Sequence, residues 1–227
     1  MVGSAMALGL GQLGFSVAVV EPYMPQPFEL SQPPDMRVSA ISVTSQTLLD
    51  DLGAWSYIKQ MRLCPYKRLS VWDKPECRTD FDCATIGHSH LGHIIENRII
   101  QLGLHQAIAD LPNVTFFSNA KVVDIKSSES SVINLSDGQT IRAKLLVGAD
   151  GGNSDVRNAV NIGVQGWQYQ QKALGIQIKT PFPQQDITWQ KFTADGPVAY
   201  LPLYDGFAAL VWYQSPQHIG YLKGLSK

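Results

Sequence analysis

Two acidic residues lie at positions where a carboxylate can contact a bound nucleotide. The first is Asp150, in the run Gly-Ala-Asp-Gly at residues 148–151, directly after the apolar residues 145–147. Small residues let the phosphates of a ligand approach the backbone, and the N-terminus of a helix favours an anion. We expect a helix after this turn, with Ser154 as its N-cap. An ordinary strand-to-helix turn has the same pattern, so that alternative stays open.

The second acid is Glu21, which ends the apolar run 15–20. Residues 3–13 read as a helix before this strand, and Gly3 lies at its start. A dinucleotide-binding fold has a glycine-rich turn before such a helix and an acid about 20 residues on for the ribose hydroxyls. Gly3 and Glu21 fit these two positions. The preceding strand is absent from the sequence, which we interpret as an N-terminal truncation.

Residues 9–14 match the pattern G-x-G-x-x-G letter by letter. That pattern binds phosphate only where it follows a strand and opens a helix. Here it lies inside the expected helix and precedes a strand. We therefore predict that Gly14 ends the helix and that this copy of the motif does not bind phosphate.

The composition excludes several classes of function. The 227 residues carry a formal net charge of −1, which gives no electrostatic case for nucleic-acid binding. No apolar run is long enough to cross a bilayer. The three cysteines form no C-x-x-C pair, so we expect a reducing compartment and neither a disulfide framework nor a metal site. For the cluster His88, His90 and His93 we favour a loop over a metal site.

Apolar periodicity predicts an α/β fold with two parts. In the first part, we expect helices over 44–53 and from 97 to 108, and a strand at 69–73. Residues 74–90 read as polar and irregular. Further strands are predicted at 114–117, 120–126, 131–135 and 141–147, with a hairpin turn at Asp137-Gly138. The last of these strands is expected to be buried in the main sheet.

After residue 162 the pattern changes to alternating β-runs. We predict strands at 173–179, 187–192, 198–203 and 207–212, joined by turns at residues 195–197 and 205–206. This pattern predicts a mostly antiparallel sheet. The last residues, 220–227, read as the start of a helix.

Several stretches together resemble a known family. They are residues 1–21, 37–42, 61–69, 91–97, 148–151, 167–169, 192–203 and 211–213. The chain resembles the flavoprotein aromatic hydroxylases of the p-hydroxybenzoate hydroxylase fold, and among them the ubiquinone-biosynthesis hydroxylases. The resemblance implies a Rossmann-like FAD-binding domain with a β-meander over 1–66 and 92–162, its first strand missing. It also implies an incomplete, mostly antiparallel substrate domain over 67–91 and 163–227.

The resemblance implies a monooxygenase reaction. Reduced FAD would form a C4a-hydroperoxide with dioxygen and deliver one oxygen atom to a polyprenyl-benzoquinol ring, with NAD(P)H or another donor supplying electrons. It also implies a cytoplasmic location, peripheral at the inner membrane, and contact with other ubiquinone-biosynthesis proteins. Alternatives are a different phenolic substrate or a non-catalytic subunit of a biosynthetic complex. A nicotinamide-dependent dehydrogenase is disfavoured by the Gly-Ala-Asp-Gly segment after a meander.

By the same resemblance, seven residues bind FAD. Gly3 would lie near the pyrophosphate, Glu21 on the adenosine ribose, and Arg37 on the diphosphate or ribityl side, where a guanidinium suits an anion. Gly148, Asp150 and Gly151 match the family's second FAD motif. Many relatives carry an arginine where this chain has Asn97. We therefore assign no role to the neighbouring Arg98. From the resemblance we expect Gln101, one helical turn further on, to reach FAD.

Two points stay open at this stage. The chain ends before the family's late Gly-Asp motif, so we expect these 227 residues to bind FAD poorly and not to turn over. No catalytic base is assigned, since His93 and Tyr213 read better as core residues. The remaining aromatic candidates either line the ring site or form a sheet core: Trp167, Tyr169, Phe192, Tyr200 and Trp212.

Overall fold

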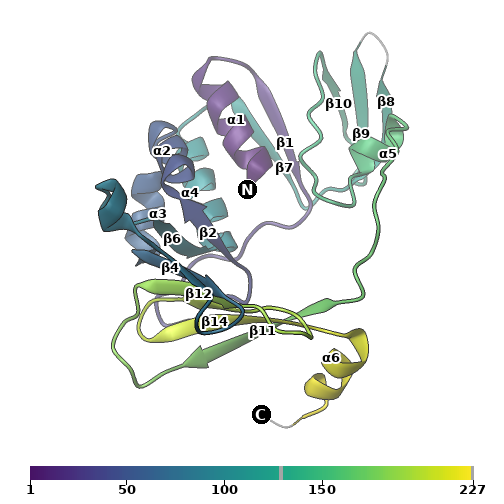
Figure 1. Ribbon diagram of the computed structural model, residues 1–227. Coiled ribbons are helices and arrows are strands. Elements are labelled where there is room, and N and C mark those ends of the chain that lie inside the picture. Colours follow the sequence, from purple (N-terminus) through teal and green to yellow (C-terminus); the bar gives the residue numbers. More distant parts are fainter. Residues whose placement is uncertain (128–129, 226–227) are drawn as a thin grey trace. The chain divides into compact units, whose positions relative to one another are not determined.

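A computed structural model describes residues 1–127 and 130–225 of the chain (Figure 1). The chain divides into two compact units. Unit 1 consists of Met1–Pro27, Asp51–Tyr57 and Gln101–Gly166, and unit 2 of Phe28–Asp50, Ile58–Ile100 and Trp167–Lys227. The assignment of an FAD-binding and a substrate domain to the sequence ranges above stays a prediction.

Unit 1 begins with the expected helix and strand. Helix α1 (Val2–Gln12) leads into β1 (Val17–Glu21), which pairs in parallel with β7 (Val114–Ser118). Gly14 ends the helix with φ +85°, and the G-x-G-x-x-G copy lies in and just after the helix, as predicted. A Cβ atom at Gly11 would lie 2.5 Å from Cγ2 of Val114. Glycine at this position therefore lets α1 pack closely on β7.

A meander forms the second sheet of unit 1. Strands β8 (Val122–Ser127), β9 (Ser131–Leu135) and β10 (Thr140–Ala143) run antiparallel in sequence order. The turn between β9 and β10 contains Gly138 at φ +87°, as Asp-Gly turns require. A small core of Ala120, Ile133 and Leu135 holds the sheet together.

The predicted buried strand at 141–147 is wrong in its second half. Strand β10 ends at Ala143, and Leu145 and Val147 are 73% and 44% exposed. Only Leu146 between them packs against the meander core. In the part of the chain that the structure describes, no strand pairs with residues 145–147. An apolar run becomes a buried strand only where a neighbouring strand takes up its backbone hydrogen bonds, and composition does not report that neighbour.

Unit 2 contains a short antiparallel sheet with β6 at its centre. Strand β6 (Gly92–Glu96) is buried along its whole length and pairs with β2 (Val38–Ser42) and β3 (Cys64–Tyr66). Helix α4 (Asn97–Ala109) follows β6 without a break. Helices α2 (Val43–Asp51) and α3 (Trp55–Met61) come earlier in the chain, and α3 and α4 each contain residues of both units.

The expected mostly antiparallel sheet is confirmed as a six-stranded sheet of unit 2 (Figure 1). Its order is β11-β14-β13-β12-β4-β5, and only β12 and β4 pair in parallel. The strands are β4 (Arg68–Trp72), β5 (Arg78–Asp82), β11 (Lys172–Lys179), β12 (Ile187–Lys191), β13 (Val198–Pro202) and β14 (Phe207–Gln214). Helix α6 (Pro216–Lys223) follows.

The prediction that residues 74–90 are irregular is wrong over residues 78–86. They include β5 and a 3-10 turn, η1 (Cys83–Ile86). Strand β5 is at the edge of the sheet and its first four residues are exposed, so its sequence lacks the apolar alternation of a half-buried strand. Within the described ranges, none of the helices combines the length and apolar character needed to span a membrane.

Candidate cofactor-binding site

The start of α1 faces the Gly-Ala-Asp-Gly turn within unit 1. A Cβ atom at Gly3 would lie 3.3 Å from Cβ of Ala149. Met1, the N-cap residue of α1, makes no capping hydrogen bond with its side chain, and the first turn of the helix contains no acid. The first N–H groups of a helix need partners from outside the helix, and they carry a partial positive charge. An uncapped start among small side chains therefore fits a bound anion.

Glu21 and Gln101 come together at the end of β1. Gln101 Nε2 donates to Glu21 Oε2 at 3.4 Å, and the backbone N–H of Tyr23 donates to Glu21 Oε1 at 3.0 Å. These bonds fix the direction of the carboxylate. Each carboxylate oxygen has a second lone pair, so Glu21 can still accept from the hydroxyls of a sugar.

His105 belongs to the same neighbourhood, although the sequence analysis did not single it out. It lies four residues after Gln101 on α4, which places the two on one face. Its Nε2 lies 3.2 Å from Oγ of Ser4 in α1. Burial lowers the pKa of His105, and Glu21 opposes the shift only in part. The ring is therefore neutral at pH 7 and packs on Phe116 at 4.8 Å between centroids.

Asp150 caps the short helix α5 (Asp155–Ala159). Its Oδ1 accepts from Ser154 Oγ at 2.5 Å, and its Oδ2 accepts from the N–H of Asp155 at 2.7 Å. Burial on its own would raise the pKa of Asp150, but these hydrogen bonds and that from Val156 hold it below its ordinary value. Ser154 is the N-cap, as predicted, because its Oγ accepts from the N–H of Arg157.

The glycines on either side of Asp150 give the turn its shape. A Cβ atom at Gly148 would lie 3.0 Å from Cγ1 of Val156, and Gly151 has φ +84°. A side chain at either place would collide or strain the backbone. Six of the seven expected residues thus belong to unit 1, and their contacts with FAD stay a prediction.

The seventh residue, Arg37, belongs to unit 2 and precedes β2. Its side chain is exposed, and its carbonyl accepts from the N–H of Asn97 at 3.0 Å. Asn97 Oδ1 also accepts from Ser39 Oγ at 2.6 Å. The undecided Arg98 forms a two-point ion pair with Asp35, at 2.7 and 3.2 Å. The part expected for Arg37 stays a prediction.

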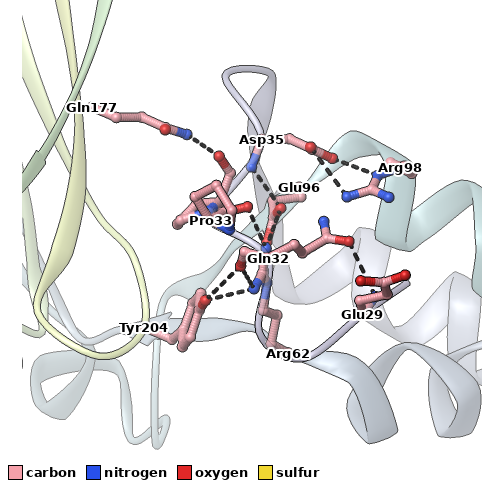
Figure 2. Close-up of polar contacts among 10 residues, drawn as sticks. Glu29, Gln32, Pro33, Asp35, Arg62, Glu96, Arg98, Gln177 and Tyr204 are labelled. Atoms are coloured by element: carbon pink, nitrogen blue, oxygen red, sulfur yellow. Dashed lines mark hydrogen bonds and ion pairs between the residues drawn. The ribbon is translucent and has the colours of Figure 1, made fainter. Parts of the chain in front are cut away.

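The sequence analysis missed a buried ion pair in unit 2. Figure 2 shows Arg62 at the centre of a polar network with Glu96. Arg62 Nε lies 2.5 Å from Glu96 Oε1, and Nη2 lies 2.8 Å from Oε2, with both side chains 4% exposed. The available signal was an acid directly after the apolar pair Ile94-Ile95, since a buried carboxylate needs a partner.

The residues considered as a catalytic base or as a lining of the ring site differ in how deeply they are buried. His93 is buried, and its pKa is lowered to about 4 by burial and then by His90. Trp167 and Tyr169 are 78% and 75% exposed, so they do not form a sheet core. Trp189 stacks on Tyr200 across β12 and β13 at 5.5 Å.

Of the remaining aromatic candidates, Phe192 and Tyr213 are exposed and Trp212 is half-buried.

The three cysteines are free thiols. Over residues 1–127 and 130–225, no three His, Cys, Asp or Glu side chains gather as a metal site would require.

The donor set of unit 1 fits FAD. An uncapped helix start suits a diphosphate, and a fixed carboxylate suits a ribose. Gly3 and Gly148 let α1 and α5 pack closely on the turn between them, because a Cβ atom at either position would crowd Ala149 or Val156.

Known proteins agree with this fit. The sequence model of a family described as "FAD binding domain" matches residues 1–218. A relative from Escherichia coli (strain K12), 3-demethoxyubiquinol 3-hydroxylase, is 43% identical over 227 residues, which is 100% of this chain and 58% of the relative. A relative from Rattus norvegicus, ubiquinone biosynthesis monooxygenase COQ6, mitochondrial, is 37% identical over 241 residues, covering 98% of this chain and 50% of the relative. The chain thus spans between half and three-fifths of their length.

Solved structures share the fold. PqsL, described as a probable FAD-dependent monooxygenase from Pseudomonas aeruginosa, aligns with a TM-score of 0.78 at 18% identity, over 96% of this chain and 59% of PqsL. The p-nitrophenol 4-monooxygenase PnpA from Pseudomonas putida DLL-E4 aligns with a TM-score of 0.75 at 17% identity, over 100% and 56%. At such identities the likeness establishes the fold alone, and it confirms the expected p-hydroxybenzoate hydroxylase type.

Proposed function

Since this chain belongs to the FAD binding domain family, we propose that it is part of an FAD-dependent monooxygenase that hydroxylates a polyprenyl-benzoquinol ring in ubiquinone biosynthesis. The names of the two relatives support this substrate class, as one is a 3-demethoxyubiquinol hydroxylase and the other a ubiquinone biosynthesis monooxygenase. The resemblance of residues 61–69, 167–169 and 211–213 points to the same group, nearest to the 2-polyprenyl-3-methyl-6-methoxy-1,4-benzoquinol hydroxylases.

One observation carries the FAD part of the proposal. The uncapped start of α1 lies against Ala149, and β1 ends in a carboxylate that Gln101 holds in place. A helix start for a diphosphate and an acid for a ribose are the two contacts that this type of fold offers a dinucleotide.

The residues of this chain then bind and orient the cofactor. The N–H groups at the start of α1 bind the pyrophosphate, with Gly3 leaving room for it, and Glu21 accepts hydrogen bonds from the adenosine ribose. Arg37 binds the diphosphate or ribityl side as a permanent cation. The turn around Asp150 closes the other side. Bound flavin supplies dioxygen activation and oxygen transfer, with electrons from NAD(P)H or another donor.

The substrate class has a consequence for location. A polyprenyl chain partitions into lipid at about 0.8 kcal/mol per buried CH₂ group, so the enzyme has to reach its substrate at a membrane surface. We propose a cytoplasmic enzyme that associates peripherally with the inner membrane and with other ubiquinone-biosynthesis proteins.

Two measurements test the proposal. Titration of FAD, followed by quenching of flavin fluorescence, tests the cofactor in these 227 residues and in a chain extended to the length of the relatives. We expect weak binding by the first and tight binding by the second, and no binding by either would reject the FAD assignment. Inactivation of the gene, followed by mass spectrometry of extracted quinones, tests the substrate. We expect loss of the mature quinone and accumulation of a polyprenyl-quinol that lacks one ring oxygen. Unchanged quinone in the inactivated strain would reject the substrate class, and accumulation of another phenol would replace it.

A further inference from the structure

We propose that Arg62 and Glu96 are positioning residues for Arg37, because their ion pair fixes the segment 28–36 that leads into it. The inference rests on the proposed role of Arg37 at the FAD diphosphate. The inference assigns a role to the Arg62–Glu96 ion pair, whose side chains contact none of the residues expected to bind FAD. A buried pair of charges does not by itself stabilise a fold more than apolar residues would, so its geometry calls for another explanation.

Every N–H group of Arg62 has a partner within unit 2. Nε and one N–H of Nη2 bind Glu96, as described above. Nη1 donates to the carbonyl of Gln32 at 2.8 Å and to the hydroxyl of Tyr204, and Nη2 donates to the carbonyl of Pro33 at 3.1 Å. Only a guanidinium offers five donors in one plane. Arg62 therefore donates hydrogen bonds to two successive carbonyls of the segment at once.

Aromatic rings enclose the guanidinium. Its central carbon lies 4.4 Å from the ring centroid of Tyr204 and 5.1 Å from that of Phe28. Such cation–π contacts strengthen when the cation is desolvated, as Arg62 is. The guanidinium of Arg62 is thus held both by Tyr204, which lies between β13 and β14, and by Glu96 at the end of β6.

Glu96 holds the same segment at its far end. Its Oε2 accepts from the backbone N–H of Asp35 at 2.7 Å, and Glu96 is the strand partner of Val38. Arg37 lies between these two points, and its own carbonyl is bonded to Asn97. The backbone of Arg37 is therefore fixed on both sides, while its side chain is left exposed.

Two prolines limit how the backbone of the segment can be held. Pro33 and Pro34 have no N–H group, so their carbonyls are the only polar backbone handles that they offer. Arg62 takes the carbonyl of Pro33, and Gln177 Nε2 donates to that of Pro34 (Figure 2). A fixed backbone lowers the entropy that is lost when Arg37 binds an anion. We expect the effect on FAD affinity to be about tenfold, equivalent to ordering roughly one residue.

Hydrogen exchange in the full chain gives the first test, and it needs no ligand. We compare Arg62→Lys with the matched control Arg68→Lys, whose guanidinium pairs with Asp186 on the surface. Lysine keeps the charge but cannot reach five acceptors. We expect exchange in the peptide covering 33–38 to rise at least about tenfold in Arg62→Lys and to stay unchanged in the control. Equal exchange in both variants would overturn the inference.

A double-mutant cycle with FAD as the probe gives the second test. If Arg62 acts through Arg37, then Arg62→Lys weakens FAD binding about tenfold in the native chain but has no further effect in Arg37→Ala. Glu96→Gln, which keeps an acceptor for the N–H of Asp35, serves if Arg62→Lys does not fold. Additive losses would mean that Arg62 only supports the fold and would refute the positioning role. No loss in Arg37→Ala alone would instead refute the proposed function at Arg37, which hydrogen exchange does not depend on.

Discussion

Two of the three glycines in α1, Gly9 and Gly11, should respond differently to the same substitution. A Cβ atom at Gly9 would lie 3.5 Å from Cδ2 of Leu52, which is an ordinary contact, whereas one at Gly11 would lie 2.5 Å from Cγ2 of Val114 and 2.9 Å from Cδ1 of Leu111. Alanine in place of glycine stabilises the interior of a helix by about 1 kcal/mol. Overpacking a well-filled contact costs about 1–3 kcal/mol.

These values give a signed expectation for each variant. Gly9→Ala should be more stable by about 1 kcal/mol, since it gains helix propensity without a clash. Gly11→Ala gains the same propensity but also overpacks, so it should lie about 1–3 kcal/mol below Gly9→Ala. For a chain of this size each kcal/mol shifts Tm by about 2–4 °C.

Thermal unfolding followed by circular dichroism measures both variants, and hydrogen exchange of the α1 amides shows whether the change is local. A Gly11→Ala variant as stable as Gly9→Ala would refute the reasoning. The pair also tests the G-x-G-x-x-G pattern at 9–14. If that pattern bound phosphate, both substitutions would weaken FAD binding, whereas we expect Gly9→Ala to leave the affinity unchanged.

Three further predictions follow from the site. Glu21→Gln should weaken FAD binding by about tenfold, because a bond to a charged acceptor becomes a neutral one, and flavin fluorescence quenching measures it; an unchanged Kd would remove Glu21 from the site. Asp150→Ala should lose about 1 kcal/mol of stability at neutral pH, and faster exchange should appear in α5. Since folding lowers the pKa of Asp150, this contribution should be lost as pH falls from the ordinary carboxyl pKa to the lower pKa of the folded state, and a pH-independent difference would contradict it. The pKa of His93 is lowered from 6.5 to about 4. The free energy of unfolding should therefore fall by about 2–3 kcal/mol as pH falls from 6.5 to 4, because the unfolded state binds the proton more tightly. His93→Gln should flatten this part of the profile of unfolding free energy against pH.

Local chemistry in the sequence was enough for the elements that carry their own signal. The helix and strand at 3–21 were predictable because apolar spacing and Gly14 mark their ends, and the hairpin at Asp137-Gly138 because few residues adopt positive φ. The cap at Ser154 was predictable because a serine hydroxyl readily accepts a hydrogen bond from the first N–H groups of a helix.

What failed depended on neighbours that are distant in sequence. Leu145 and Val147 have the composition of a buried strand, but burial requires a pairing partner. Strand β5 was missed because an exposed edge strand needs no apolar face. Arg62 and Glu96 are 34 residues apart, and no spacing rule pairs them. The hydrogen bond between Gln101 and Glu21 was not predicted, and neither was the part that Asp150 plays at the start of α5.

The grip of Arg62 on the segment before Arg37 has an evolutionary consequence. It holds main-chain carbonyls of Gln32 and Pro33, and every amino acid presents a carbonyl. A change of side chain at either position therefore leaves in place the carbonyl that Arg62 binds. Arg62 and Glu96, which contribute side-chain atoms, can change only as a pair. The anchoring is thus encoded in two positions that lie outside the segment they hold.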